Sequence, residues 1–184
     1  HVLGPTGSGK TSLVILPLSK QAIDKQRGCC FIDFKGDEVF KRYVQQKAKE
    51  NKKDFYYFSI DPNEKSVGYN PLFSGDIHSK VDRIMSALEL IYHGPAGFYS
   101  NVQAMTFVEL LKEMTNEKKE INFLSVKDAL EDPNFLERID VSKQEIKGLL
   151  AAISWIAGLE VINRDQLDLA KVIKNGDVVF FALK

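Results

Sequence analysis

One glycine-rich segment near the start of the chain sets the architecture that we expect; it reads Gly4-Pro5-Thr6-Gly7-Ser8-Gly9-Lys10-Thr11. The segment satisfies the pattern G-x-x-x-x-G-K-[ST], with an additional glycine in its interior. A loop that wraps a polyphosphate with successive backbone N–H groups needs glycines, because they permit positive φ and a close approach of the main chain. The segment therefore predicts a phosphate-binding loop, or P-loop.

The surroundings of this loop agree with the prediction. The loop follows an apolar strand end at 1–3 and precedes a helix predicted over 12–27, which Gly28 would end. The helix N-terminus would face the anion, Lys10 would reach the β and γ phosphates, and the Thr11 hydroxyl would bind Mg²⁺. We expect Lys10 and Thr11 to be catalytic, with Thr11 as the metal ligand. The residues expected to bind ATP are Gly4, Pro5, Thr6, Gly7, Ser8, Gly9, Lys10, Thr11, Ser12 and Asp33.

Short apolar runs separated by amphipathic segments predict a parallel βαβ core. Strands are predicted at 29–33 and 55–60, with an amphipathic helix over 37–49 between them. Near the end of the chain, a helix over 165–174 and a strand over 178–183 are expected to return to the same sheet. With the strand end at 1–3, this order indicates the α/β class with a parallel sheet.

The segment 79–159 differs, since nearly every periodic stretch in it is helical. Apolar residues recur on one helix face, as do Val81, Ile84, Met85, Leu88 and Ile91. Residues 142–145 have capping-box spacing ahead of another apolar stripe. We therefore expect a first part of the nucleotide-binding core at 1–78, an inserted all-α domain at 79–159 and a return to the core at 160–184.

Composition limits the classes of protein to which the chain can belong. It has 184 residues, of which 44% are hydrophobic, and its 25 Lys and Arg balance 25 Asp and Glu. The chain is long enough to bury a core, and its zero net charge offers no global basic field for holding nucleic acid. This composition argues against a disordered chain or a coiled coil.

Three further features bear on the setting of the protein. No apolar run reaches the roughly 18 residues of a membrane span, so we expect this piece of chain to be soluble. Its start at His1, three residues before the P-loop, suggests a part of something longer. The adjacent Cys29 and Cys30 lie in an apolar run and are expected to be a buried pair in a reducing compartment.

Two other motif matches favour different functions, and spacing argues against both. Residues 33–36 fit D-x-x-G and residues 51–54 fit N-K-x-D, as in a GTPase, but only fourteen residues separate them and the second motif precedes a strand. We expect 51–54 to be a solvated turn. The strand at 29–33 comes too early in the chain to be a Walker B strand. Asp33 is instead expected to support the nucleotide site from the carboxyl end of its strand.

Taken in order, four elements of the sequence resemble the motifs of the TraD/TraG-type coupling proteins of conjugation and type IV secretion. After the P-loop come Asp33-Phe34-Lys35-Gly36-Asp37, Ile60-Asp61-Pro62 and Tyr69-Asn70-Pro71-Leu72. The family has an Asp-Pro-Lys-Gly-Glu-like segment, so Phe34 and Asp37 are mild departures from it. The resemblance covers about residues 1 to 75, and the rest of the chain only in layout.

The resemblance implies a RecA-like P-loop core with an inserted all-α domain, in a hexameric motor that uses ATP and Mg²⁺ to deliver DNA or protein substrates into a secretion channel. It implies a place at the cytoplasmic face of the bacterial inner membrane, through a transmembrane segment not found here. The implied partners are a DNA–relaxase complex or secreted proteins, and inner-membrane components of the type IV secretion system. The family's Walker B Asp-Glu strand is missing before Lys184, so we expect this stretch alone to hydrolyse ATP poorly.

Two other functions fit parts of the same pattern. A receptor module would recruit secretion substrates through 79–159, with nucleotide only setting its shape. An FtsK/HerA-like DNA translocase would share the P-loop but should lack the large helical insertion.

Overall fold

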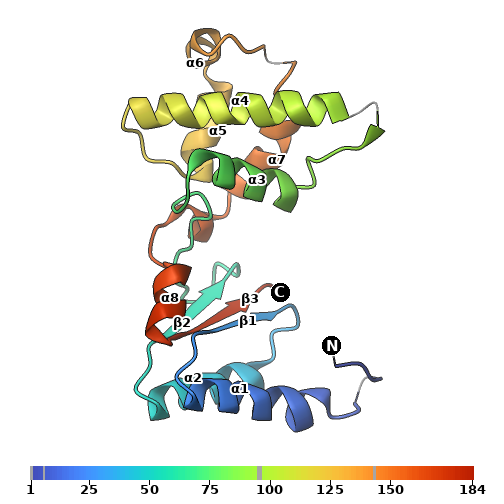
Figure 1. The fold of residues 1–184 in the computed structure, drawn as a ribbon, viewed down its shortest axis with the longest axis vertical. Helices are drawn as coiled ribbons and strands as arrows, with labels where there is room; N and C mark the ends of the chain where they lie inside the picture. The colour runs from blue at the N-terminus through green and yellow to red at the C-terminus, as the bar shows by residue number, and fades with distance from the viewer. Residues whose placement is uncertain (1, 6, 95–96, 143) are drawn as a thin grey trace. The chain divides into compact units, whose positions relative to one another are not determined.

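The computed structural model describes residues 2–5, 7–94, 97–142 and 144–184. The chain divides into two compact units (Figure 1). We call His1–Tyr69 with Gln166–Lys184 the sheet unit, and Asn70–Asp165 the helical unit. The helical unit is therefore an insertion in the sequence of the sheet unit. The helical unit runs from residue 70 to residue 165. The sequence pattern predicted bounds of 79 and 159.

Within the described residues, the sheet unit contains a three-stranded parallel sheet made of β1 (Cys29–Asp33), β2 (Phe55–Ser59) and β3 (Val178–Ala182). The strand order is β1-β3-β2, so that the last strand of the chain lies in the centre and pairs in parallel with both others. Every residue of β3 is buried, as a central strand covered on both faces requires. The predicted α/β class with a parallel sheet is confirmed.

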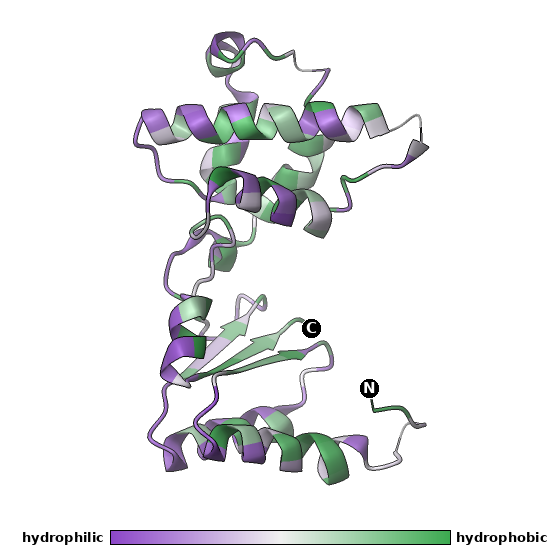
Figure 2. Ribbon diagram, in the orientation of Figure 1, coloured by the Kyte–Doolittle hydropathy of each residue, from purple (hydrophilic) through white to green (hydrophobic). Residues whose placement is uncertain are grey.

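Helices cover the two faces of the sheet (Figure 1). A π-helical turn η1 (Lys10–Ile15) leads into α1 (Leu16–Asp24), which packs beside α2 (Glu38–Glu50) on one face. Helix α8 (Leu169–Asn175) lies on the opposite side. The strands of the sheet are coloured mainly as hydrophobic in Figure 2. The core between the sheet and the first two helices is apolar and is built from Ile23, Cys29, Val44, Ala48, Val178, Phe180 and Ala182.

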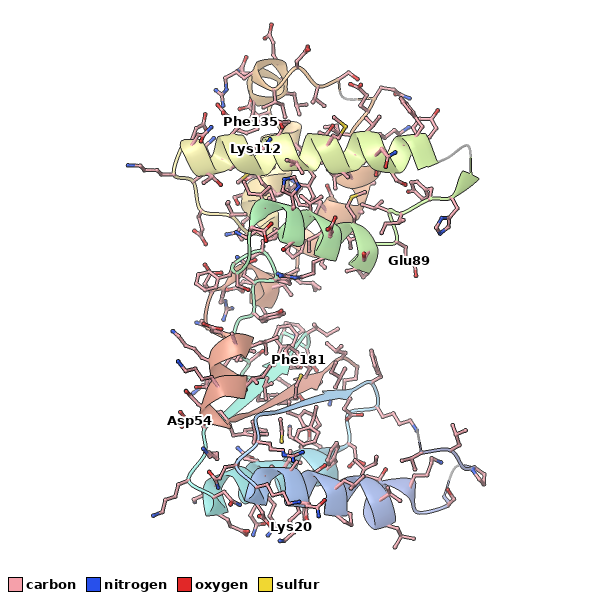
Figure 3. The ribbon with its side chains drawn as sticks, in the orientation of Figure 1. Lys20, Asp54, Glu89, Lys112, Phe135 and Phe181 are labelled. Carbon is pink, nitrogen blue, oxygen red and sulfur yellow. The ribbon has the colours of Figure 1, made fainter. Side chains whose placement is uncertain are left out.

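The other face of the sheet carries its own aromatic cluster. Phe181 of β3, labelled in Figure 3, packs against Phe58 at 5.1 Å and Tyr69 at 5.7 Å between ring centroids. Because side chains alternate along a strand, the residues of β3 serve the two cores in turn. The central position of β3 thus joins both cores of the sheet unit.

Two predicted elements of the sheet unit differ from the structure. The apolar residues at the start of the chain form no strand over Val2–Pro5, and Leu3 is 90% exposed, because they pair with no other strand among the described residues. The last helix begins at Leu169 instead of 165, because the Asp168 side chain accepts hydrogen bonds from the N–H groups of Ala170 and Lys171 and thereby caps it.

The cysteine prediction is wrong for one of the two residues. Cys29 is buried, but Cys30 is exposed. Successive side chains of a strand point to opposite faces, and β1 is an edge strand whose second face is only partly covered. Ile32, which shares that face with Cys30, is likewise 59% exposed.

The helical unit is built from α3 (Ile77–Ala87), α4 (Gly97–Asn116), α5 (Phe123–Glu131), α6 (Pro133–Arg138), α7 (Lys147–Ala157) and the 3₁₀ turn η3 (Glu160–Asn163). Helix α3 packs on α4, and α5 packs on both α6 and α7. Its fully buried side chains include Phe107, Leu110, Leu111, Met114, Phe123, Leu130, Phe135, Ile146 and Leu149. The unit therefore has a hydrophobic core of its own.

The described residues of the helical unit contain two reciprocal capping boxes. The one that the sequence predicted at 142–145 is present: the Ser142 N–H donates to the Glu145 carboxylate at 2.8 Å, and the Glu145 N–H donates to the Ser142 hydroxyl at 3.4 Å, although the regular helix α7 begins only at Lys147. The sequence did not predict the second box, at the start of α5, where the Asn122 side chain accepts from the Ser125 N–H at 2.8 Å and the Ser125 hydroxyl accepts from the Asn122 N–H at 3.0 Å. Among the described residues, no helix is both long and apolar enough to cross a membrane.

Candidate functional site

The glycine-rich loop adopts a conformation that only glycines hold without strain. Gly7 has φ of 83° and Gly9 has φ of 78°, both in the left-handed region. Gly4 lies so close to Ser8 that a Cβ there would come within 2.8 Å of the Ser8 hydroxyl. Thr6, which the sequence also places in the loop, lies outside the described residues. Gly7 and Gly9 are thus needed for the backbone conformation of the loop, whereas the close neighbour of Gly4 is a side chain that can rotate.

Lys10 closes the loop on itself. Its ammonium donates hydrogen bonds to the carbonyl oxygens of Gly4 and Pro5, both at 2.6 Å, and lies 3.5 Å from the Ser8 hydroxyl. A single side chain therefore connects the two ends of the loop. The bonds also hold a positive charge against the loop, where an anion would be bound.

The helix that follows the loop starts with a turn wider than that of an α-helix. Leu13 N–H donates to Gly9 O at 2.8 Å, but Leu16 N–H donates to Thr11 O, five residues back. The sequence predicts an ordinary helix from residue 12. A short π-helical segment of this kind is uncommon and often occurs at functional sites.

A cavity of about 500 Å³ lies beside the loop, within the roughly 300–1,000 Å³ of small-molecule sites. One wall is made by the loop and the start of its helix, and the other by the segment after β1. The lining residues are Gly7, Ser8, Gly9, Lys10, Thr11, Ser12, Leu16, Lys35, Asp37, Val39 and Phe40. The structure thus brings six of the expected ATP-binding residues, 7 to 12, to one cavity.

Three other expected residues take different positions. Gly4 and Pro5 do not line the cavity, and they contribute their carbonyl groups to Lys10 instead. Asp33 does not line it either. Its carboxylate accepts from the N–H groups of Lys35 at 3.0 Å and Asp37 at 2.6 Å. Asp33 therefore shapes the loop that follows β1.

Five of the lining residues were given no site role from the sequence, and two of them, Lys35 and Asp37, are charged. Asp37 is the N-cap of α2, and its carboxylate accepts from Phe40 N–H at 3.0 Å. The signal that could have identified them is their position directly after a parallel strand, since ligands of open α/β sheets bind at the carboxyl ends of the strands.

The residues of the cavity suit a magnesium-bound polyphosphate. Lys10 and Lys35 provide two cations against the one carboxylate of Asp37. Mg²⁺ in nucleotide sites keeps several waters and takes only one or two protein oxygens, which the Thr11 hydroxyl and the Asp37 carboxylate could supply. The described residues contain no group of three or more His, Cys, Asp or Glu able to hold a metal by themselves. The donor set therefore fits a metal that arrives with phosphate.

A second polar cluster lies at the carboxyl ends of β2 and β3. The Tyr57 hydroxyl donates a hydrogen bond to Glu64, and the Lys184 ammonium lies 3.4 Å from the other oxygen of that carboxylate. Burial and the bond to Glu64 raise the pKa of Tyr57 to about 12. Hydrogen bonds from Tyr57, Ser59 and Lys184 lower the pKa of Glu64 to about 2. The Lys184 side chain also packs so tightly on Gly36 that a Cβ there would collide with it.

The other short motifs singled out in the sequence, at 51–54, 60–62 and 69–72, contribute residues with structural roles. Asn70 is buried, and its amide donates to Ile121 O at 2.8 Å while its side-chain oxygen accepts from Leu72 N–H at 2.9 Å. The Asp61 carboxylate accepts from Asn63 N–H at 2.9 Å in a surface turn. Residues Asn51 and Lys52 form the turn after α2, where the sequence predicted one, and Lys52 has φ of 56°.

No protein-family model matches the sequence, and no curated protein matches it.

Proposed function

We propose that this chain is the nucleotide-binding part of a P-loop ATPase of the conjugative coupling-protein type, a RecA-like core with an inserted all-α domain. The observation that carries the proposal is the cavity of about 500 Å³ that the glycine-rich loop, Lys10 and Thr11 share with the segment after β1. The loop has the positive φ values at Gly7 and Gly9 that a phosphate cradle needs. Its ligand would be ATP with Mg²⁺.

The proposed reaction is phosphoryl transfer to water. The loop amides and the Lys10 ammonium would neutralise charge on the transferred group, and the cavity residues would keep the phosphate chain in one position. The Thr11 hydroxyl would hold magnesium, which would supply positive charge that offsets the negative charge of the phosphates. In this role Lys10 has to exchange at least part of its bonding to Gly4 and Pro5 for bonds to phosphate.

The large helical unit supports a coupling protein over an FtsK/HerA-like translocase. It is inserted between β2 and β3 and has its own core, whereas a translocase of that kind should lack such an insertion. The order of the Asp-x-Lys-Gly, Asp-Pro and Asn-Pro-Leu segments after the P-loop agrees with the same choice. The proposed task is delivery of DNA or protein substrates to a type IV secretion channel by a hexamer at the cytoplasmic face of the inner membrane. Its partners would be a DNA–relaxase complex or secreted proteins, together with inner-membrane components of the secretion system.

Nucleotide binding tests the proposal directly. Titration calorimetry with Mg²⁺ and ATP should detect binding to the 184-residue chain, and Lys10→Ala should weaken it at least about tenfold, because charge-assisted hydrogen bonds contribute about 1.5–3 kcal/mol each. Lys49→Ala, which removes an exposed lysine of α2, is the control and should bind as the wild type does. Absence of ATP binding by the wild-type chain, or equal affinity of the Lys10→Ala variant, would contradict the proposal.

A further inference from the structure

We infer that Lys35 is a second phosphate-binding cation of the same cavity and that it contacts the terminal phosphate of a bound nucleoside triphosphate. The inference rests on the proposed nucleotide-binding function and adds a residue that distinguishes tri- from diphosphate. The inference starts from the position of Lys35, which lines the cavity in the segment that follows β1 and not in the P-loop.

The backbone of Lys35 is held in place although the residue lies in an exposed loop. Its N–H donates to one oxygen of the Asp33 carboxylate at 3.0 Å, and the N–H of Asp37 donates to the other at 2.6 Å. Between them, Gly36 has φ of 70° and packs against the Lys184 side chain. These contacts fix the loop on the end of β1, so that the Lys35 side chain starts from a defined point on the cavity wall.

The two lysines of the cavity differ in what already surrounds them. The Lys10 ammonium donates to two carbonyl oxygens of its own loop at 2.6 Å. Lys35 takes part in no ion pair within residues 2–5, 7–94, 97–142 and 144–184; the neighbouring lysines Lys41 and Lys184 pair with Glu38 and Glu64 instead. The anionic side chain in the lining, Asp37, is bonded to the N-terminus of α2. Lys35 is therefore the cation of the cavity that is available to an incoming anion without breaking an existing bond.

The positions of the two lysines on different walls of the cavity indicate which phosphate Lys35 contacts. Amides of a P-loop surround the phosphate that enters the loop, and the Lys10 side chain originates at the same wall. A longer phosphate chain has to extend beyond the loop into the cavity, where the remaining cationic side chain is Lys35. A triphosphate should reach it, and a diphosphate should reach it less well.

The test compares ATP and ADP, each with Mg²⁺, by titration calorimetry on the 184-residue chain and its variants. Lys35→Ala should weaken ATP binding about tenfold and ADP binding by less than about threefold, a difference typical of one charge-assisted hydrogen bond. Lys35→Arg, which keeps the charge, should restore most of the ATP affinity. Lys49→Ala, an exposed lysine outside the cavity, should change neither affinity. Circular dichroism should give the same thermal transition for all four proteins, because Lys35 and Lys49 are both exposed.

The outcomes separate this inference from the proposed function. If the wild-type chain binds ATP and Lys35→Ala binds it equally well, the role of Lys35 is overturned while the nucleotide site stands. Equal losses for ATP and ADP would overturn the assignment to the terminal phosphate. A wild-type chain that binds neither nucleotide would overturn both the site and the inference.

Discussion

The carboxylates of Asp33 and Asp37 bond to the backbone around them. The Asp33 carboxylate accepts hydrogen bonds from two N–H groups of the loop after β1. The Asp37 carboxylate accepts a hydrogen bond from the Phe40 N–H at the start of α2. A carboxylate that receives such bonds is well placed to hold a loop, since bonds with a charged partner contribute about twice as much as neutral ones. The positive charge among the lining residues of the cavity therefore comes from Lys10 and Lys35.

The paired Tyr57 and Glu64 should make stability depend on pH at both extremes. The pKa of Glu64 is lowered to about 2, so its contribution is present above its ordinary pKa of about 4.5 and is lost as pH falls towards 2. The pKa of Tyr57 is raised to about 12, so its contribution is present below about pH 10 and is lost as pH rises through 12.

Tyr57→Phe should therefore lower the free energy of unfolding at neutral pH by about 1–2 kcal/mol, and by less near pH 2. Urea denaturation of both proteins at a series of pH values measures the difference. Tyr99→Phe, in which the altered ring is 61% exposed, should have no such effect. A Tyr57→Phe penalty that stays constant from pH 7 to pH 2 would contradict the role of this bond.

At the scale of elements, caps and close contacts determine where the helices begin and end. Helix α2 begins after Asp37, and α8 begins after Asp168. Helix α8 ends at Asn175 and is capped by Gly176, whose φ is 72°. A Cβ at Gly176 would collide with the carbonyl oxygen of Gln26, so glycine is needed there for two reasons. Capping residues therefore set the start of α2 and both ends of α8.

The N-cap of α2 offers a direct measurement. Asp37→Ala removes the acceptor of the Phe40 N–H bond and should destabilise the sheet unit by about 1 kcal/mol. Asp37→Asn keeps a capping oxygen and should cost much less. Chemical denaturation followed by far-ultraviolet circular dichroism gives both values, and equal stability of the alanine and asparagine variants would show that the cap contributes nothing.

On the scale of the whole molecule, the helical unit should be able to fold without the rest of the chain. Its core includes Phe107, Leu110, Phe123 and Phe135, which are all fully buried and all belong to this unit. Residues 70–165 expressed alone should therefore be helical by circular dichroism and should unfold cooperatively on heating. Phe135→Ala in this fragment should cost about 3–5 kcal/mol and shift the transition to lower temperature. A fragment without a cooperative transition would contradict this expectation.

Local patterns in the sequence were enough for some of these features and insufficient for others. The apolar runs of β1, β2 and β3 identified the strands, and the glycines with Lys10 identified the loop, because both signals lie within a few neighbouring residues. The exposure of Cys30 was missed because it depends on β1 being an edge strand. Lys35 and Asp37 were missed because a cavity wall is formed by residues that are distant in sequence.

By itself, the sequence determined the α/β class, the parallel strands, the helical character of the middle segment and the glycine-rich loop. These features follow from hydrophobic periodicity and from the backbone freedom of glycine, which act locally. Only the tertiary structure decided that β3 lies between β1 and β2, that Asp33 binds backbone amides, and that Lys35 shares a cavity with Lys10. Strand order and cavity walls arise from packing between distant segments, and no local pattern specifies them.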